Sequence, residues 1–136
     1  MPATIAQNNY GKSRVRLIKV ARDIDRHEIQ NLSIDIALEG DFDAIHKEGD
    51  NSLCLPTDTM KNTVYALAGE TREIEEVEAF GIRLASYLLT NNEQVRRVRL
   101  NLAEHGWKRI KVEDGEHDHS FVRGSAERRV ALIDST

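Results

Sequence analysis

Two segments of this 136-residue chain hold residues whose types could do chemistry, and they lie far apart in the sequence. In the first, Lys12 follows Gly11 at the start of an apolar segment, where a chain can bend closely around another group. Such a lysine is either a solvated cation or, if it is desolvated beside a hydroxyl, a base, because burial lowers the proton affinity of the amine. The residue types leave both interpretations open.

The second segment, residues 55–63, carries hydroxyls and a carboxylate where a helix is expected to begin. Thr57 or Thr59 can cap that helix, because a threonine oxygen accepts a hydrogen bond from an N–H of the first turn. Alternatively, the free N–H groups of the helix start, together with Thr57 and Asp58, form a pocket for a small anionic or heteroaromatic ligand. Spacing alone does not choose between a cap and a pocket.

Histidines are a third source of chemistry, since His117 and His119 lie two residues apart, and His46 and His105 add further donors. The adjoining residues 114–116 are typical of a hydrated turn, and neither CxxC nor HExxH spacing occurs. We therefore expect loop histidines and no metal site. The GxSxG, GxxxxGK[ST] and GxGxxG motifs are also missing from the sequence, which disfavours serine hydrolases, P-loop NTPases and Rossmann enzymes.

Composition predicts one ordinary globular domain, with 40% hydrophobic and 31% charged residues. The net charge of −4 argues against a nucleic-acid partner, so the basic run at 96–99 is interpreted as the solvated face of a strand. Apolar runs are too short to span a membrane, and no signal-peptide pattern begins the chain, which predicts a cytoplasmic protein, or a peroxisomal one in a eukaryote. Cys54 is the only cysteine, so an intramolecular disulfide is impossible.

Hydrophobic periodicity predicts four strands and two helices. The clearest strand covers residues 31–39, where Leu32, Ile34, Ile36 and Leu38 alternate with more polar residues. Residues 42–50 form a short mixed segment that ends in a turn, and residues 1–8 form a flexible N-terminal arm. The other predicted elements are strands at 13–22 and at 97–102 with continuation through 107–112, a final strand at 120–123 and 129–133 interrupted by a charged loop at 124–128, and helices at 57–68 and 71–91.

The element order predicts an α+β fold, an antiparallel four-stranded sheet with both helices packed on one face. Asp35, Glu39, Arg97 and Arg99 would then line the uncovered, polar face. Such a sheet has two free edges, which invite pairing unless they are protected. Closing several sheets into a water-filled barrel would remove the edges, so we expect an oligomer.

Several motifs together resemble the urate oxidase (uricase) family, over about residues 9–133. They are Tyr10-Gly11-Lys12 with Val15-Arg16, residues 49–52, residues 57–65, residues 107–109, residues 117–123 and residues 127–129. The resemblance implies the tunnelling fold (T-fold) in ββααββ order, with residues 9–136 as a single domain equivalent to the first of two tandem domains. It also implies cofactor-free oxidation of urate by O2 to 5-hydroxyisourate and H2O2.

Carried over by position, Lys12 matches the family's catalytic lysine and Thr57 the threonine whose hydroxyl relays protons between that lysine and the dioxygen or water site. Asp58 matches the residue whose backbone N–H meets a ring nitrogen of urate. The family's catalytic histidine, stacking phenylalanine, and clamping arginine and glutamine belong to the second domain, so the resemblance implies activity only with a complementary half. Two alternatives stay open: a non-catalytic binding or assembly module, and another purine- or pterin-binding tunnelling-fold enzyme.

Overall fold

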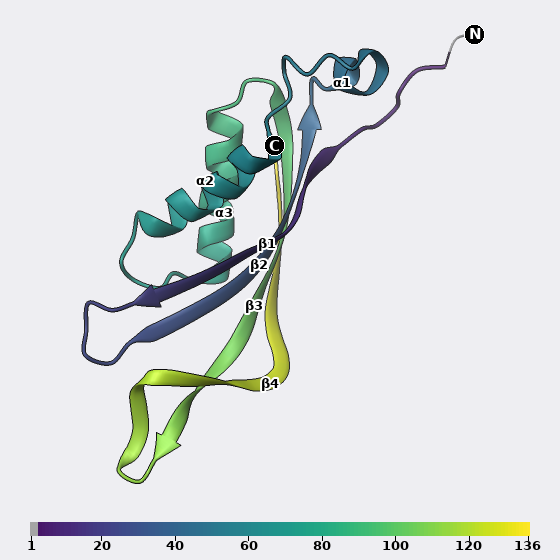
Figure 1. Ribbon diagram of the computed structural model, residues 1–136. Helices are drawn as coiled ribbons and strands as arrows, with labels where there is room; N and C mark the ends of the chain where they lie inside the picture. The colour runs from purple at the N-terminus through teal and green to yellow at the C-terminus, as the bar shows by residue number, and fades with distance from the viewer. Residues whose placement is uncertain (1–2) are drawn as a thin grey trace.

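The computed structural model describes residues 3–136, apart from the side chain of Ser125. Its four strands form one antiparallel sheet in the order β1-β2-β3-β4 (Figure 1). The α+β architecture and the strand and helix order predicted from periodicity are confirmed, with one additional short helix. The elements along the chain are β1 (Tyr10–Ala21), β2 (Glu28–Gly40), α1 (Asp43–Glu48), α2 (Thr57–Gly69), α3 (Val77–Thr90), β3 (Val95–Val112) and β4 (Gly115–Ser135).

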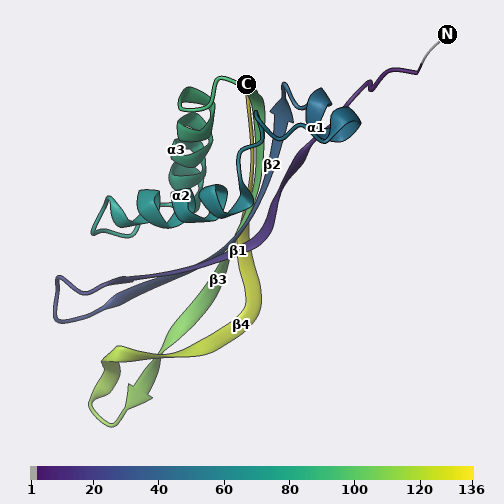
Figure 2. The same cartoon turned by 45° about the horizontal axis from the view of Figure 1, so that its top comes forward.

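Helices α2 and α3 both lie on one face of the twisted sheet, as predicted, and cross each other there (Figures 1 and 2). Beyond the helices, the β1–β2 and β3–β4 hairpins continue as two long arms. Among residues 3–136, no helix combines the length and the apolar character that crossing a membrane requires.

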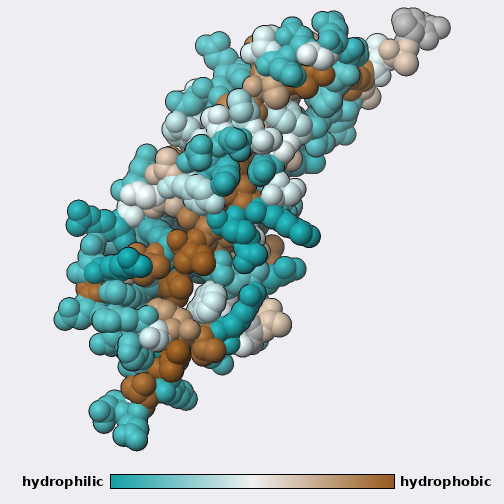
Figure 3. All heavy atoms as spheres, in the orientation of Figure 1, coloured by the Kyte–Doolittle hydropathy of each residue, from teal (hydrophilic) through white to brown (hydrophobic). Residues whose placement is uncertain are grey.

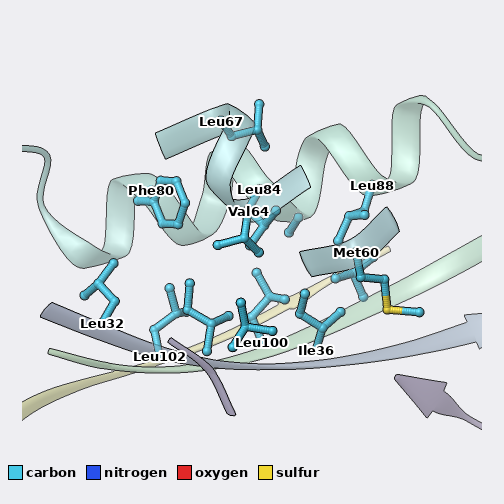
Figure 4. Packing of buried hydrophobic residues seen from close by; sticks show 14 of the residues in the cluster. Leu32, Ile36, Met60, Val64, Leu67, Phe80, Leu84, Leu88, Leu100 and Leu102 are labelled. Carbon is cyan, nitrogen blue, oxygen red and sulfur yellow. The ribbon is translucent and has the colours of Figure 1, made fainter. Parts of the chain in front are cut away.

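The core lies between the sheet and these two helices, where side chains of both layers interlock (Figure 4). Alternation along β2 places every second residue on this face, and helical spacing supplies the opposing stripe. Burying this apolar surface is the main favourable term for the domain, at about 25 cal/mol per Å². The predicted core residues Leu32, Ile34, Ile36, Leu38, Met60, Val64, Val77 and Leu84 are all at most 3% exposed.

The opposite face of the sheet is polar, as expected, and its upper part carries a network of ion pairs. Arg97 donates two hydrogen bonds to the carboxylate of Asp134, at 2.8 and 2.6 Å, and lies 3.3 Å from Glu39. Arg99 lies 3.5 Å from the same Asp134 carboxylate. Asp35 is exposed further along β2. The surface in the view of Figure 3 is largely hydrophilic, with apolar areas gathered in its lower half.

The second helix begins later than predicted. α3 starts at Val77 rather than Thr71, and its N-cap Glu76 is extended, with ψ of 142°. The preceding segment is held by contacts with the sheet: the Gln30 side chain donates to the Glu75 carbonyl at 2.8 Å, and the Lys19 amine donates to the Thr71 hydroxyl at 2.7 Å. These tertiary hydrogen bonds compete with helical ones, so only Glu78 remains as an acidic residue in the first turn.

The predicted interruption of the last strand is also wrong, because β4 runs without a break from Gly115 to Ser135. The charged run 124–128 is accommodated as an irregularity in register instead. Trp107 pairs with Arg123, whereas His105 pairs with Arg128, so β4 advances five residues while β3 advances two. Such a bulge bends the strand and re-aims its side chains without ending it.

Residues 42–50 contain helix α1, which the mixed sequence pattern did not predict. The turn expected at its end is confirmed, since Gly49 closes the helix in the left-handed conformation with φ of 66°. Of the proposed N-terminal arm, residues 1 and 2 lie outside the described residues. Within the remainder, the side chains of Gln7 and Asn8 donate to Glu39 and Asp43 at 3.1 and 2.8 Å.

Candidate functional site

The strand that carries Lys12 and the segment that leads to Thr57 are joined by a tyrosine. The Tyr10 hydroxyl accepts a hydrogen bond from the Leu55 N–H at 2.7 Å and donates one to the Leu55 carbonyl at 3.1 Å. The tyrosine ring packs edge-on against Phe42, with ring centroids 4.7 Å apart. Burial, first of all, raises the pKa of the Tyr10 hydroxyl, which therefore stays protonated and can keep donating.

Lys12 lies on β1, opposite Ile36 of β2, and is half-buried. The glycine before it permits close pairing of the two strands, because a Cβ on Gly11 would meet the Ile36 carbonyl oxygen at 1.7 Å. Immediately after Lys12 the register of β1 shifts, and Arg14 adopts a positive φ of 56°. Lys12 therefore lies at the beginning of a β-bulge, a feature that re-directs neighbouring side chains.

Thr57 and Asp58 are the first two residues of α2, and both are exposed. The N-cap is Pro56, which has no side-chain capping hydrogen bond, so the expectation that Thr57 or Thr59 caps the helix is wrong. Proline suits the position before the helix because it is compatible with extended backbone there. The Thr57 hydroxyl and the first N–H groups of α2 are consequently left to meet water or a ligand.

Lys12 and Thr57 lie on neighbouring elements, β1 and α2. Among the described residues, however, no hydrogen bond joins their side chains. A lysine–threonine hydrogen bond does occur elsewhere, between Lys19 and Thr71 at 2.7 Å. Burial is the main cause that lowers the pKa of Lys19. This second pair lies beside a hollow of about 340 Å³ between β1 and the end of α2, and it provides a matched comparison for Lys12 and Thr57.

His117 and His119 belong to strand β4, not to a loop as predicted. The His119 ring lies 4.1 Å from the ring of His27, between centroids, and its Nε2 lies 2.7 Å from the Asp25 carbonyl oxygen. Arg109 donates to the His27 carbonyl. These contacts join the tips of the two hairpins. Where the structure describes the chain, no three His, Cys, Asp or Glu side chains form a group that could hold a metal ion.

Sequence reasoning missed Tyr10 and Leu55 as positioning residues for this site. The available signal was weak: a tyrosine before the glycine of β1, and an apolar residue before the proline that precedes α2. Neither residue type indicates that the other is its partner, because the pair is separated by 45 positions.

Comparison with known proteins places this chain among uricases. The family profile described as Uricase matches residues 8–134. The chain is 41% identical over 130 residues to the uricase of Arthrobacter globiformis, covering 96% of this chain and 41% of the relative. It is 35% identical over 133 residues to the uricase of Cyberlindnera jadinii, covering 96% of this chain and 44% of the relative.

Solved structures of uricases also match this chain. The crystal structure of the uricase from Arthrobacter globiformis matches with a TM-score of 0.89 at 40% identity, covering 98% of this chain and 45% of that one. A uricase from a Bacillus species has the same fold, with a TM-score of 0.84 at 23% identity over 96% of this chain and 46% of that one. The predicted tunnelling fold is thereby confirmed. The chain spans less than half the length of these relatives, and over that span it belongs to the uricase family.

Proposed function

We propose that this chain supplies the first half of a urate oxidase site, which a second tunnelling-fold half completes. The family match over residues 8–134 supports the proposal. The observation that carries it is the double hydrogen bond between Tyr10 and Leu55, which brings the elements bearing Lys12 and Thr57 together. The reaction converts urate, O2 and water to 5-hydroxyisourate and H2O2 without a cofactor.

In this proposal Lys12 and Thr57 form a proton relay. The Lys12 amine takes a proton from bound urate through the Thr57 hydroxyl, which leaves an electron-rich urate dianion. Two electrons then pass from the dianion to O2, water adds a hydroxyl to the oxidised ring, and the released protons convert peroxide to H2O2. The N–H of Asp58, free in the first turn of α2, holds a ring nitrogen of urate.

The second half has two tasks in the proposed enzyme. It supplies charge-assisted contacts to the urate oxygens, and it covers the exposed start of α2 from water. Because positioning contributes a large part of enzymatic rate enhancement, the isolated chain should oxidise urate far more slowly than the complete assembly.

The relay is tested by single substitutions in the assembly that contains both halves. We expect Lys12→Met or Thr57→Ala to reduce urate-dependent oxygen uptake by about 10²–10⁴-fold, the usual contribution of a positioned proton-transfer group. Lys19→Met and Thr59→Ala are the matched controls, because they remove the same side chains from the same strand and helix. Both controls should keep nearly normal turnover, and all four variants should fold.

Normal turnover in the Lys12→Met and Thr57→Ala variants would reject the relay. If Lys19→Met lost as much turnover as Lys12→Met, the role of base would be assigned to the Lys19–Thr71 pair instead. If the unmodified assembly neither bound nor oxidised urate, the chain would be a non-catalytic binding or assembly module instead.

A further inference from the structure

A basic hollow of about 470 Å³ lies on the sheet face opposite the helices. All four strands contribute to it, so it belongs to the middle of the sheet and not to one loop. Its charged and polar side chains on β1, β3 and β4 are Arg14, Arg16, Asn101, His105, Arg123 and Arg128, and β2 adds Ser33 and Asp35. None of the three residues of the proposed relay site lines this hollow.

The charges in this basic hollow are not balanced. Four guanidinium groups face one carboxylate, that of Asp35, a formal excess of three positive charges when His105 is neutral. Asp35 accepts a hydrogen bond from the Arg14 backbone N–H at 2.7 Å. Among the described carboxylates other than that of Glu127, none forms an ion pair with any of the four guanidinium groups. On the same face, by contrast, Arg97 is paired with both Asp134 and Glu39.

Strand alternation in β1 and an irregularity in β4 bring the arginines together. Arg14 and Arg16 are two residues apart on β1, so strand alternation places both on the face opposite the buried Val15. The bulge in β4 places Arg123 opposite Trp107 and Arg128 opposite His105, although the two arginines are five residues apart. Four cations therefore converge on one site, and the two of β4 do so only because of the bulge.

The hollow also contains a neutral hydrogen-bonding pair. Nε2 of His105 lies 3.0 Å from the hydroxyl of Ser33, on adjacent strands. Burial, followed by the positive charges of Arg123, Arg16 and Arg128, lowers the pKa of His105. The lowered pKa of His105 thus reflects a positive electrostatic environment, which a bound anion would offset.

We propose that this basic hollow is a binding site for a multiply charged oxyanion, either an inorganic anion of the phosphate and sulfate class or a small polycarboxylate. The paired N–H donors of a guanidinium group match the planar or tetrahedral arrangement of oxygen atoms in such anions. They bind these oxygens through charge-assisted hydrogen bonds. Ser33 and Asn101 add hydroxyl and amide donors. The volume falls within the usual range of small-molecule sites, about 300–1,000 Å³.

Calorimetric titration of the native assembly with sulfate, citrate and chloride tests the proposal. Sulfate stands for the inorganic source and citrate for the polycarboxylate, while chloride measures simple screening of charge. We expect sulfate or citrate, or both, to bind with a defined stoichiometry and more tightly than chloride, and the stronger of the two identifies the source. In NMR spectra, the bound anion should raise the pKa of His105, which faces Arg16 of β1, Ser33 and Asp35 of β2, and Arg123 and Arg128 of β4.

Two variants and a control locate the site. Arg123→Gln and Arg128→Gln should each weaken binding by about tenfold or more, as expected when a charge-assisted hydrogen bond is lost. Arg72→Gln removes an equal charge from an exposed position outside the hollow and should bind as the unmodified protein does. The proposal is overturned if sulfate and citrate bind no more tightly than chloride, if His105 titrates identically with and without them, or if Arg72→Gln weakens binding as much as Arg123→Gln.

Discussion

Tyr10 and Leu55 exchange two hydrogen bonds, one into the Tyr10 hydroxyl at 2.7 Å and one out of it at 3.1 Å. One side chain therefore satisfies both backbone groups of a buried residue. Lys12 lies two residues after Tyr10, and Thr57 lies two residues after Leu55. The same contact that closes the edge of the core consequently sets the distance between the two segments of the proposed site.

The Tyr10→Phe variant should therefore lose stability. It keeps the ring against Phe42 but leaves the N–H and C=O of Leu55 without their partner, which should lower the free energy of unfolding by about 1–3 kcal/mol. Tyr65→Phe is the matched control, because its hydroxyl donates to the Arg16 carbonyl at an exposed position where water can replace it. Urea denaturation measures both, and equal losses would contradict the role assigned to Tyr10.

Leu84 tests the predicted core between helix and sheet. It is 0% exposed, so Leu84→Ala should lower the free energy of unfolding by about 2–5 kcal/mol through lost burial and a residual cavity. Ile82, on the outer side of the same helix, is 60% exposed, and Ile82→Ala should change stability by no more than about 0.5 kcal/mol. Thermal or denaturant unfolding of the two variants decides the matter, and similar losses would mean that α3 packs through a different stripe.

Asp134 makes part of the stability dependent on pH. Its hydrogen bonds with Arg97 are the main cause that lowers the pKa of its carboxyl below the ordinary value of 3.8. A depressed pKa stabilises the folded state above the unfolded value, and this contribution disappears as pH falls through the folded value. Stability of the unmodified protein should therefore fall more steeply below about pH 4 than that of Asp134→Asn.

Denaturation at a series of acidic pH values measures this difference. Asp114→Asn, which removes an equal charge from the β3–β4 turn, is the control and should follow the unmodified protein. Parallel curves for Asp134→Asn and the unmodified protein would show that the Arg97–Asp134 contact does not contribute.

The assembly state follows from the edges of the sheet. β1 and β4 are the outer strands, and Val130 and Leu132 of β4 are 58% and 69% exposed. Exposed edges and apolar side chains favour association with further strands. We expect light scattering at micromolar concentration to give a mass well above the 15.4 kDa of one chain, and Leu132→Lys to shift the distribution toward smaller species. A monomer at that concentration would contradict this expectation.

Local sequence patterns were sufficient for the main layers of the fold. The alternation of residues 31–39 identified β2 and its buried face, and helical spacing identified the inner stripes of α2 and α3. These features depend on which side of one element a residue occupies, and that is set by the period of the element. Lys12, Thr57 and Asp58 were assigned by resemblance alone, and their roles remain proposals.

The remaining features depend on contacts between distant residues. α3 begins at Val77 because the Gln30 side chain donates a hydrogen bond to the Glu75 carbonyl, which an earlier helical turn would use as an acceptor. The basic hollow forms because a bulge in β4 shifts its register and brings Arg123 and Arg128 to the face that carries Arg14 and Arg16 of β1. Propensity and periodicity describe neighbours along the chain, whereas the hydrogen-bond partner of a backbone group and the register of a bulged strand are selected only when separate elements pack together.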